Sequence, residues 1–201
     1  MKTRITNHPS ARTLTATATA VAAMLLLAGC VVTSIYPYYT EKDLVSDTAL
    51  PGKWVEVGAT NQPPEYVQIE SLGEKGYWAT IFSAHETNSL EVHLFRLKQQ
   101  LFLDSFSTNR SLDFVPVHQV SKVMQIGVVL ETANLNYDWL AQLLENHPNA
   151  IRHLVVHEKP EDEQKGRIVL TADTKELQRF ILKYVNNTNA WGEPSRLKRL
   201  N

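Results

Sequence analysis

The sequence predicts an α+β fold, in which an antiparallel β-meander forms a strongly curled sheet or a closed barrel and two helices follow late in the chain. Two observations indicate this class. From residue 53 to residue 132, short runs of β-branched, aromatic and aliphatic residues are separated by polar or glycine-containing turns. From residue 137, apolar residues instead recur at the three-to-four spacing of a helix.

The expected strands follow one another with short connections. Lys98-Gln99-Gln100 is a natural hairpin turn, and Gly127 breaks the chain between two further strands. Several runs are apolar on both faces, which indicates a sheet covered on both sides. The runs that predict strands are residues 53–57, 66–70, 77–84, 90–97, 101–104, 117–126, 128–132, 151–157 and 167–171.

The first predicted helix begins after Asn136, whose side chain can cap it. Pro148 lies beyond its end. Its apolar face consists of Tyr137, Leu140, Leu143 and Leu144.

The second predicted helix begins at Asp173, which with Glu176 has the spacing of a capping box. Its other face is charged, so we expect it to lie on a sheet that has one side in water. The basic tail, residues 191–201, is expected to pack over the sheet, to fray or to touch anionic headgroups. The apolar stripe of the helix consists of Leu177, Phe180, Ile181, Tyr184 and Val185.

The first thirty residues have the three parts of a secretory signal. Lys2, Arg4 and Arg12 give a positive start, an apolar run follows, and small residues end it. The run closes with Leu27-Ala28-Gly29-Cys30, which contains the only cysteine of the chain and resembles the lipobox of bacterial lipoproteins. The resemblance implies a diacylglyceryl group, with palmitate as a typical acyl chain, on the Cys30 sulfur and cleavage before this residue.

Two alternatives remain open for this segment. An uncleaved transmembrane helix over residues 14–32 would be marginal in length and interrupted by threonines. An ordinary secretory signal with an incidental cysteine would leave the mature protein without a lipid.

The lipoprotein interpretation divides the chain into a signal peptide (residues 1–29), a lipidated Cys30 with a tether (residues 30–43) and one soluble domain (residues 44–201). The tyrosines of Tyr36-Pro37-Tyr38-Tyr39 would lie in the headgroup layer or pack onto the domain. In Gram-negative lipoproteins an Asp after the cysteine resembles an inner-membrane retention signal. Val31 therefore favours the periplasmic face of the outer membrane.

Composition excludes some function classes. Removing residues 1–29 takes away three basic and no acidic residues, so the net charge changes from −1 to about −4. A mildly acidic domain does not suit nucleic acid as a partner. With Cys30 modified, no disulfide can form, and about 170 mature residues must be stable by packing, burying roughly 70% of the surface of the unfolded chain.

The tripeptide Gly52-Lys53-Trp54 matches the G-x-W with which lipocalin-like barrels open their first strand. The order of elements is similar to calycin-like barrels, which also carry a late helix. This resemblance implies a barrel interior that holds a small apolar ligand. The side chains expected to line such a cavity are Trp54, Trp78, Phe82, His93, Phe95 and Phe102.

Candidate catalytic and metal-binding patterns are weak. Ser83, His85 and Glu86 cluster in sequence, as do Asp104 and Ser105, but neither lies in a nucleophile elbow. His153 and His157 lie about 13 Å apart on an extended strand, too far for one metal ion. Residues 134–145 have calcium-loop offsets but place Trp139 where glycine is required. We therefore expect no enzyme activity, no metal and no cofactor.

The sequence thus predicts a lipid-anchored protein of the bacterial cell envelope, whose domain is a non-catalytic structural or interaction module. The alternative is a lipocalin-like carrier of a small apolar ligand. The expected partners are the membrane, through the lipid on Cys30, and an envelope protein or an apolar ligand.

Overall fold

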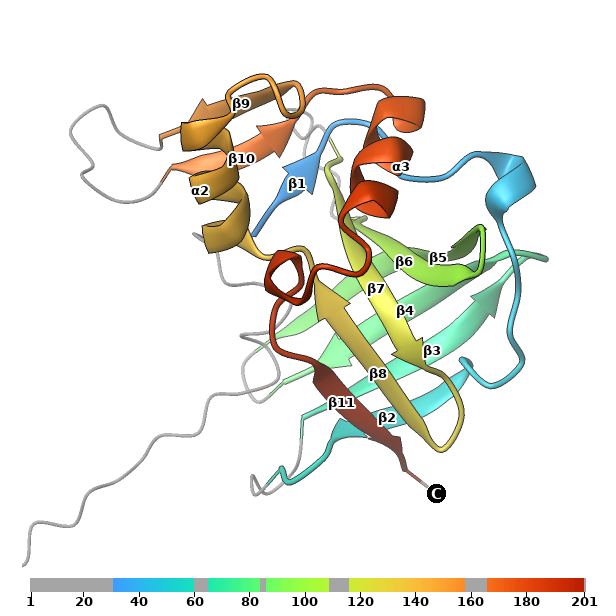
Figure 1. Cartoon of the computed structure of the whole chain (residues 1–201). Helices are drawn as coiled ribbons and strands as arrows, with labels where there is room; N and C mark the ends of the chain where they lie inside the picture. The colour runs from blue at the N-terminus through green and yellow to red at the C-terminus, as the bar shows by residue number, and fades with distance from the viewer. Residues whose placement is uncertain (1–30, 60–64, 84–85, 109–115, 158–165, 201) are drawn as a thin grey trace, which may run out of the picture.

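The computed structural model describes residues 31–59, 65–83, 86–108, 116–157 and 166–200. Cys30 and the expected signal peptide, residues 1–29, lie outside the described residues. Eight antiparallel strands close into a barrel, and a small sheet with two helices extends from one side of it (Figure 1). The predicted α+β class and the calycin-like barrel with two late helices are confirmed.

Seven barrel strands pair in chain order, as the meander predicts. A C-terminal strand then pairs with both the first and the last of them, and β6 pairs with β7, so the sheet has no open edge in the barrel. The strands are β2 (Gly52–Glu56), β3 (Tyr66–Leu72), β4 (Gly76–Phe82), β5 (Thr87–Leu97), β6 (Gln100–Ser107), β7 (His118–Gln125), β8 (Val129–Asn134) and β11 (Ser195–Arg199).

The tail therefore requires a correction, because it contains β11 and closes the barrel. Leu197 is opposite Leu130 of β8 on one side and Glu56 of β2 on the other. Only Leu197 supplies an aliphatic side chain to the interior, while Arg196 and Lys198 are exposed on the other face. A strand with one inward aliphatic residue has almost no alternating pattern, so the sequence looks like a basic tail.

The two faces of the barrel wall belong to two separate cores. Cross-strand partners lie on the same face, so the register sorts each strand into an inward and an outward set. The interior core receives side chains from all eight strands; its buried members are Leu50, Trp54, Val67, Ile69, Tyr77, Ala79, Ile81, Leu94, Val123 and Leu130.

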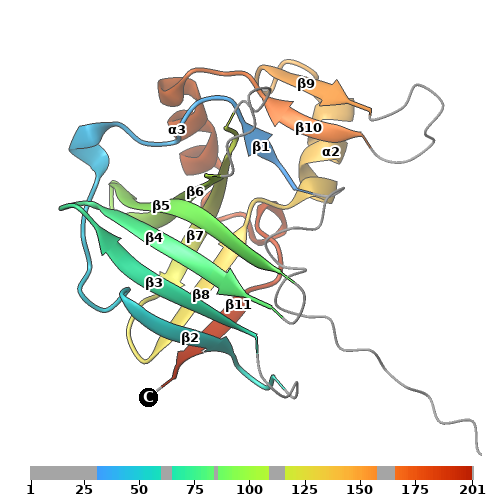
Figure 2. The same cartoon turned by 180° about the vertical axis from the view of Figure 1, so that it is seen from behind.

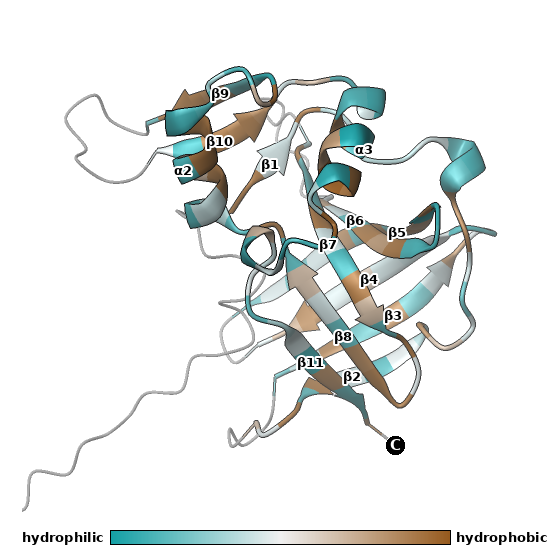
Figure 3. Ribbon diagram, viewed as in Figure 1, coloured by the Kyte–Doolittle hydropathy of each residue, from teal (hydrophilic) through white to brown (hydrophobic). Residues whose placement is uncertain are grey.

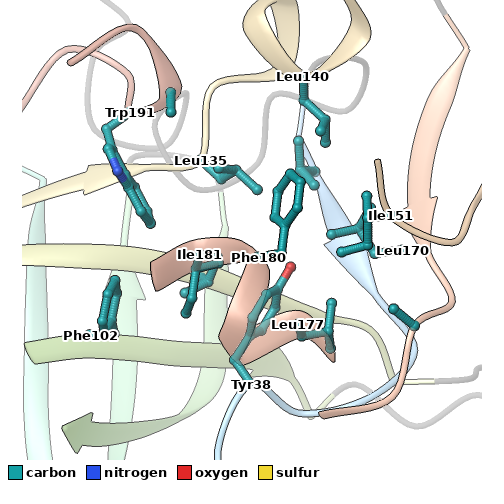
Figure 4. Packing of buried hydrophobic residues seen from close by; sticks show 14 of the residues in the cluster. Tyr38, Phe102, Leu135, Leu140, Ile151, Leu170, Leu177, Phe180, Ile181 and Trp191 are labelled. Atoms are coloured by element: carbon teal, nitrogen blue, oxygen red, sulfur yellow. The ribbon is translucent and has the colours of Figure 1, made fainter. Parts of the chain in front are cut away.

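The second core lies outside the barrel, between the outward face of β5 to β8 and the two helices (Figure 2). Figure 4 shows Phe102 of the barrel wall and Ile181 of the covering helix on facing sides of this layer. It also includes residues of the small sheet, among them Ile168 and Leu170. Both faces of the wall are buried here, so these strands need apolar residues on both sides. This explains the continuous apolar runs in the sequence.

The small sheet consists of three short strands, β1 (Thr33–Ser34), β10 (Arg167–Leu170) and β9 (His153–Val156), in that order beyond β7. Strand β1 is parallel to β10, and β10 is antiparallel to β9. Through its single pair between Ser34 and His118, β1 joins this sheet to the barrel.

Both helices begin where their caps predict. The Asn136 side chain accepts a hydrogen bond from the Trp139 amide and starts α2 (Tyr137–Asn146). Asp173 accepts from the Glu176 amide and starts α3 (Thr174–Lys183). In the described part of the chain, no helix has the length and apolarity needed to span a membrane.

Residues 31–43, the described part of the expected tether, pack onto the fold. Val32 is 3% exposed and Tyr38 is fully buried. The Thr174 hydroxyl donates to the Pro37 carbonyl and the Gln178 amide donates to the Tyr38 carbonyl. The sequence signal misled because these partners lie more than 130 residues away, whereas Pro37 suggested an irregular segment.

The next segment, residues 44–51, crosses one end of the barrel. The Val45 amide donates to the Leu94 carbonyl, and the Arg199 guanidinium donates to the Ala49 carbonyl. Leu50 is 1% exposed and belongs to the interior core. Between the short 3-10 helix Glu41–Asp43 and β2, the chain therefore covers the mouth of the barrel.

Replacing Leu177 with alanine should test the outer core. Leu177 is fully buried between α3 and the barrel wall, so Leu177→Ala should lower the free energy of unfolding by about 2–5 kcal/mol. Lys175→Ala, on the exposed face of the same helix, should change it by less than about 0.5 kcal/mol. Urea unfolding measures both, and equal losses would show that α3 does not pack on the barrel.

Candidate functional site

The register divides the side chains expected to line a cavity between the two faces of the wall. Trp54 is opposite Val67 and lies in the interior core. Phe95 and Phe102 are opposite one another and belong to the outer core.

The other three expected residues also lie on the outward face. Trp78 and Phe82 alternate with the inward residues of β4 and are half-buried. His93 alternates with the inward Leu94 on β5. The six residues therefore do not form one site. The sequence could not show this, because the wall beneath a helix is as apolar as the barrel interior.

Large side chains, Trp54 and Tyr77 among them, point into the described interior. The Trp54 indole N–H donates to the Leu50 carbonyl at 2.8 Å, and the Arg199 guanidinium lies 5.0 Å from the Trp54 ring centre. The Tyr77 hydroxyl accepts from the Asp47 amide at 2.7 Å, at the covered mouth. An eight-stranded barrel is just wide enough to be filled by its own side chains or to hold one small ligand.

A polar cluster lies on the outward face of β6 and β7, at its boundary with the N-terminal segment. The Asp104 carboxylate is fully buried. Its Oδ1 lies 2.7 Å from His118 Nδ1. Its other oxygen accepts the Tyr38 amide N–H at 2.9 Å. The Phe106 ring lies 5.0 Å from the His118 ring. Asp104 therefore joins three segments of the chain.

A second histidine lies beside this cluster. His93 Nε2 is 2.9 Å from a Glu91 carboxylate oxygen, and its ring lies 4.7 Å from the Tyr39 ring. Among the described residues its buried Nδ1 has no hydrogen-bond partner. Burial raises the pKa of the Tyr39 hydroxyl, and the carboxylates of Asp104 and Glu91 raise it further.

A histidine–carboxylate pair could serve a nucleophile as a base, but the neighbouring hydroxyl does not suit that role. Ser34 is opposite His118 in the register, yet it is fully buried and its Oγ accepts the Tyr36 amide N–H at 3.2 Å. The geometry around Asp104 is that of a structural connection.

The other sequence-predicted chemistry does not assemble. Ser105 alternates with Asp104 and faces the other side of β6. The Ser83 hydroxyl donates to the Glu86 carbonyl within a turn, and His85 lies outside the described residues. Within the described ranges, no three His, Cys, Asp or Glu side chains are grouped so that they could hold a metal ion. Asn136, the third residue of the calcium-like pattern, is the helix cap.

Sequence reasoning missed a groove between α2 and the small sheet. It has a volume of about 630 Å³. Ala141 and Leu144 of α2 and Val155 and Ile168 of the sheet line it with apolar surface, and Glu145 lies at its side. The signal in the sequence was the run Leu154-Val155-Val156, which reads as a buried strand although all three residues are exposed.

Comparison of the chain with protein-family models, with curated proteins and with solved structures finds no match. The class of the protein is therefore described by its fold alone. It is an eight-stranded calycin-like barrel with an external helical layer.

The Tyr38 hydroxyl gives a test of the cluster. It points into the apolar layer of Leu177 and Phe180 and has no hydrogen-bond partner among the described residues (Figure 4). Burial raises its pKa, and Asp104 adds to this. Because an unpartnered buried hydroxyl costs about 1–3 kcal/mol, Tyr38→Phe should leave the free energy of unfolding unchanged or raise it.

Tyr77→Phe is the matched control, because the Tyr77 hydroxyl bonds to the Asp47 backbone. This variant should lose about 0.5–1.5 kcal/mol in the same urea titration. A loss of the same size in Tyr38→Phe would mean that the Tyr38 hydroxyl has a partner.

Proposed function

We propose that this is a lipid-anchored protein of the bacterial cell envelope, whose barrel domain is a non-catalytic interaction module. The lipobox-like Leu27-Ala28-Gly29-Cys30 supports the anchor. The observation that carries the proposal is the burial of Val32, because the chain joins the fold two residues after Cys30. Two residues span at most about 7 Å, so an acyl group on Cys30 would hold the domain directly against the membrane.

The bonds around the N-terminal segment support a fixed orientation of the anchored domain. Residues 37 and 38 are bonded to α3 on one side and to Asp104 on the other. The Asp43 carboxylate accepts from Thr40 and Gln178. Burial opposes ionisation of Asp43, but these hydrogen bonds outweigh it and lower its pKa. A domain held this way presents the same surfaces to the envelope at all times, as an interaction module requires.

The groove beside α2 is the surface that we assign to a protein partner. Its apolar lining and the carboxylate of Glu145 suit a segment that carries an aliphatic side chain and a basic one. Strand β9 is the last strand of the described sheet, so its outer edge can pair with an extended segment.

Replacing Cys30 with serine should test the anchor. Cys30→Ser removes the sulfur that would take the diacylglyceryl group, so the protein should keep its leader and lose its acyl mass. Ser10→Ala, in the same leader, should change none of these. Intact-mass spectrometry after detergent partition measures them. A Cys30→Ser chain that still begins at residue 30 and partitions into detergent would contradict the anchor.

A photo-crosslinking amino acid in the groove should test the partner surface. Placed at Gln142, which lines the groove and is exposed, it should give a discrete crosslinked species in intact cells. Placed at Lys175, exposed on α3, it should give none. Identical products from both positions, or none from Gln142, would argue against this surface.

The second candidate function is a carrier of a small apolar molecule, which the closed eight-stranded barrel and its outer helix favour. Native mass spectrometry of the whole protein in detergent tests it. The large side chains that point into the interior predict the mass of the acylated polypeptide alone. An additional few hundred daltons, lost on denaturation, would favour the carrier.

A further inference from the structure

The face of the small sheet turned away from α2 carries exposed apolar residues. Leu154 and Val156 alternate with Val155 on β9, and Val155 lines the groove beside α2. Leu154 and Val156 therefore point to the opposite face, where they are 59% and 47% exposed. Figure 3 shows the apolar end of β9 next to the apolar β10.

Strand β9 is a short edge strand, and its exposed aliphatic side chains have no charged neighbour within the strand. Natural sheets protect their edges with charged side chains, prolines or bulges. The sequence of β9 is His153-Leu154-Val155-Val156, which contains none of the charged or proline residues, and its pairing with β10 is regular. An edge of this kind is expected to be covered in the cell.

The register places this face close to the anchor. Thr33 of β1 is opposite Val169 of β10, and Val169 is opposite Leu154 of β9. Two strand spacings amount to about 10 Å. Cys30 precedes Thr33 by three residues, which span at most about 10 Å. An acylated Cys30 would thus insert its chains within about 20 Å of Leu154.

Strand direction brings Val156 to the same end of the sheet as Cys30. Strands β1 and β10 are parallel, so both start at this end, where Arg167 of β10 is opposite Val156. Arg167 is exposed and lies on the same face as Leu154 and Val156. Aliphatic side chains with an arginine among them match the boundary between acyl chains and anionic headgroups.

We propose that Leu154, Val156 and Arg167 form the membrane-contact face of the protein, which lies on the lipid bilayer beside the acylated Cys30. This proposal rests on the proposed lipid anchor and names the surface that the anchor presents to the membrane. Val32, two residues after Cys30, is buried in the outer core, which leaves the domain little length with which to stand away from the lipid. The two aliphatic side chains enter the headgroup layer, and Arg167 faces lipid phosphate.

A fluorophore on β9 tests the proposal in the full-length, lipidated protein. Leu154→Cys, labelled with an iodoacetamide derivative of the environment-sensitive dye NBD, is reconstituted in vesicles of phosphatidylethanolamine and phosphatidylglycerol. Leu154 is largely exposed, so the label should not disturb folding. The matched control is Val128→Cys, at a site 83% exposed next to the β7–β8 turn, at the opposite end of the molecule from β9.

The expected result is a blue-shifted emission at position 154 and at least twofold stronger quenching by lipids with spin labels near the headgroup than at position 128. Two results overturn the proposal while the anchor stands. One is equal, water-like emission from both positions in protein that floats with the vesicles. The other is a blue shift at position 154 without quenching by the lipid, which would assign the Leu154 face of β9, and not only its edge, to a second copy or another protein.

The same preparations report on the anchor separately. Acylated Cys30 has no free thiol, so the wild-type chain should take up no label. Uptake by the wild type at Cys30, or failure of the protein to float with vesicles, overturns the lipid anchor and the membrane face with it.

Discussion

The buried Asp104 carboxylate is the interaction on which the arrangement of this protein depends. It pairs with His118 of β7 and accepts the Tyr38 amide N–H, so it joins two barrel strands to the start of the chain. A buried carboxylate is tolerated only when its oxygens have such partners. Strand β1, which precedes Tyr38, pairs with both β7 and β10, so the small sheet continues the barrel wall.

The structure distinguishes the interior of the barrel from the surfaces outside it, which the sequence alone does not distinguish. The barrel interior holds its own side chains, from Trp54 at one strand to Leu130 at another, and serves stability. The surfaces that we propose for function lie outside it, on the small sheet: the groove beside α2 on one face and the exposed Leu154 and Val156 on the other. In this account the protein acts through its surface and its position at the membrane.

The features that could be predicted are those with local causes. Asn136 and Asp173 cap helices through residues three positions away, and alternating strands join through short turns. The missed features depend on distant partners. Tyr38 meets Asp104 across 66 residues, and Phe95 is equally apolar whether it faces the barrel interior or the outer core. The alternation of residues along the sequence identifies a strand. It does not show which of two covered faces points into the barrel.

The most direct test of this account is hydrogen exchange of the amides of Ile35 and Tyr38 in the full-length protein. Both are bonded in the fold, to the Leu170 carbonyl and to Asp104. The account predicts that they exchange as slowly as the amides of the barrel strands. Rapid exchange, as in a free chain, would mean that residues 31–43 are a tether after all, and the fixed placement of the domain on the membrane would be contradicted.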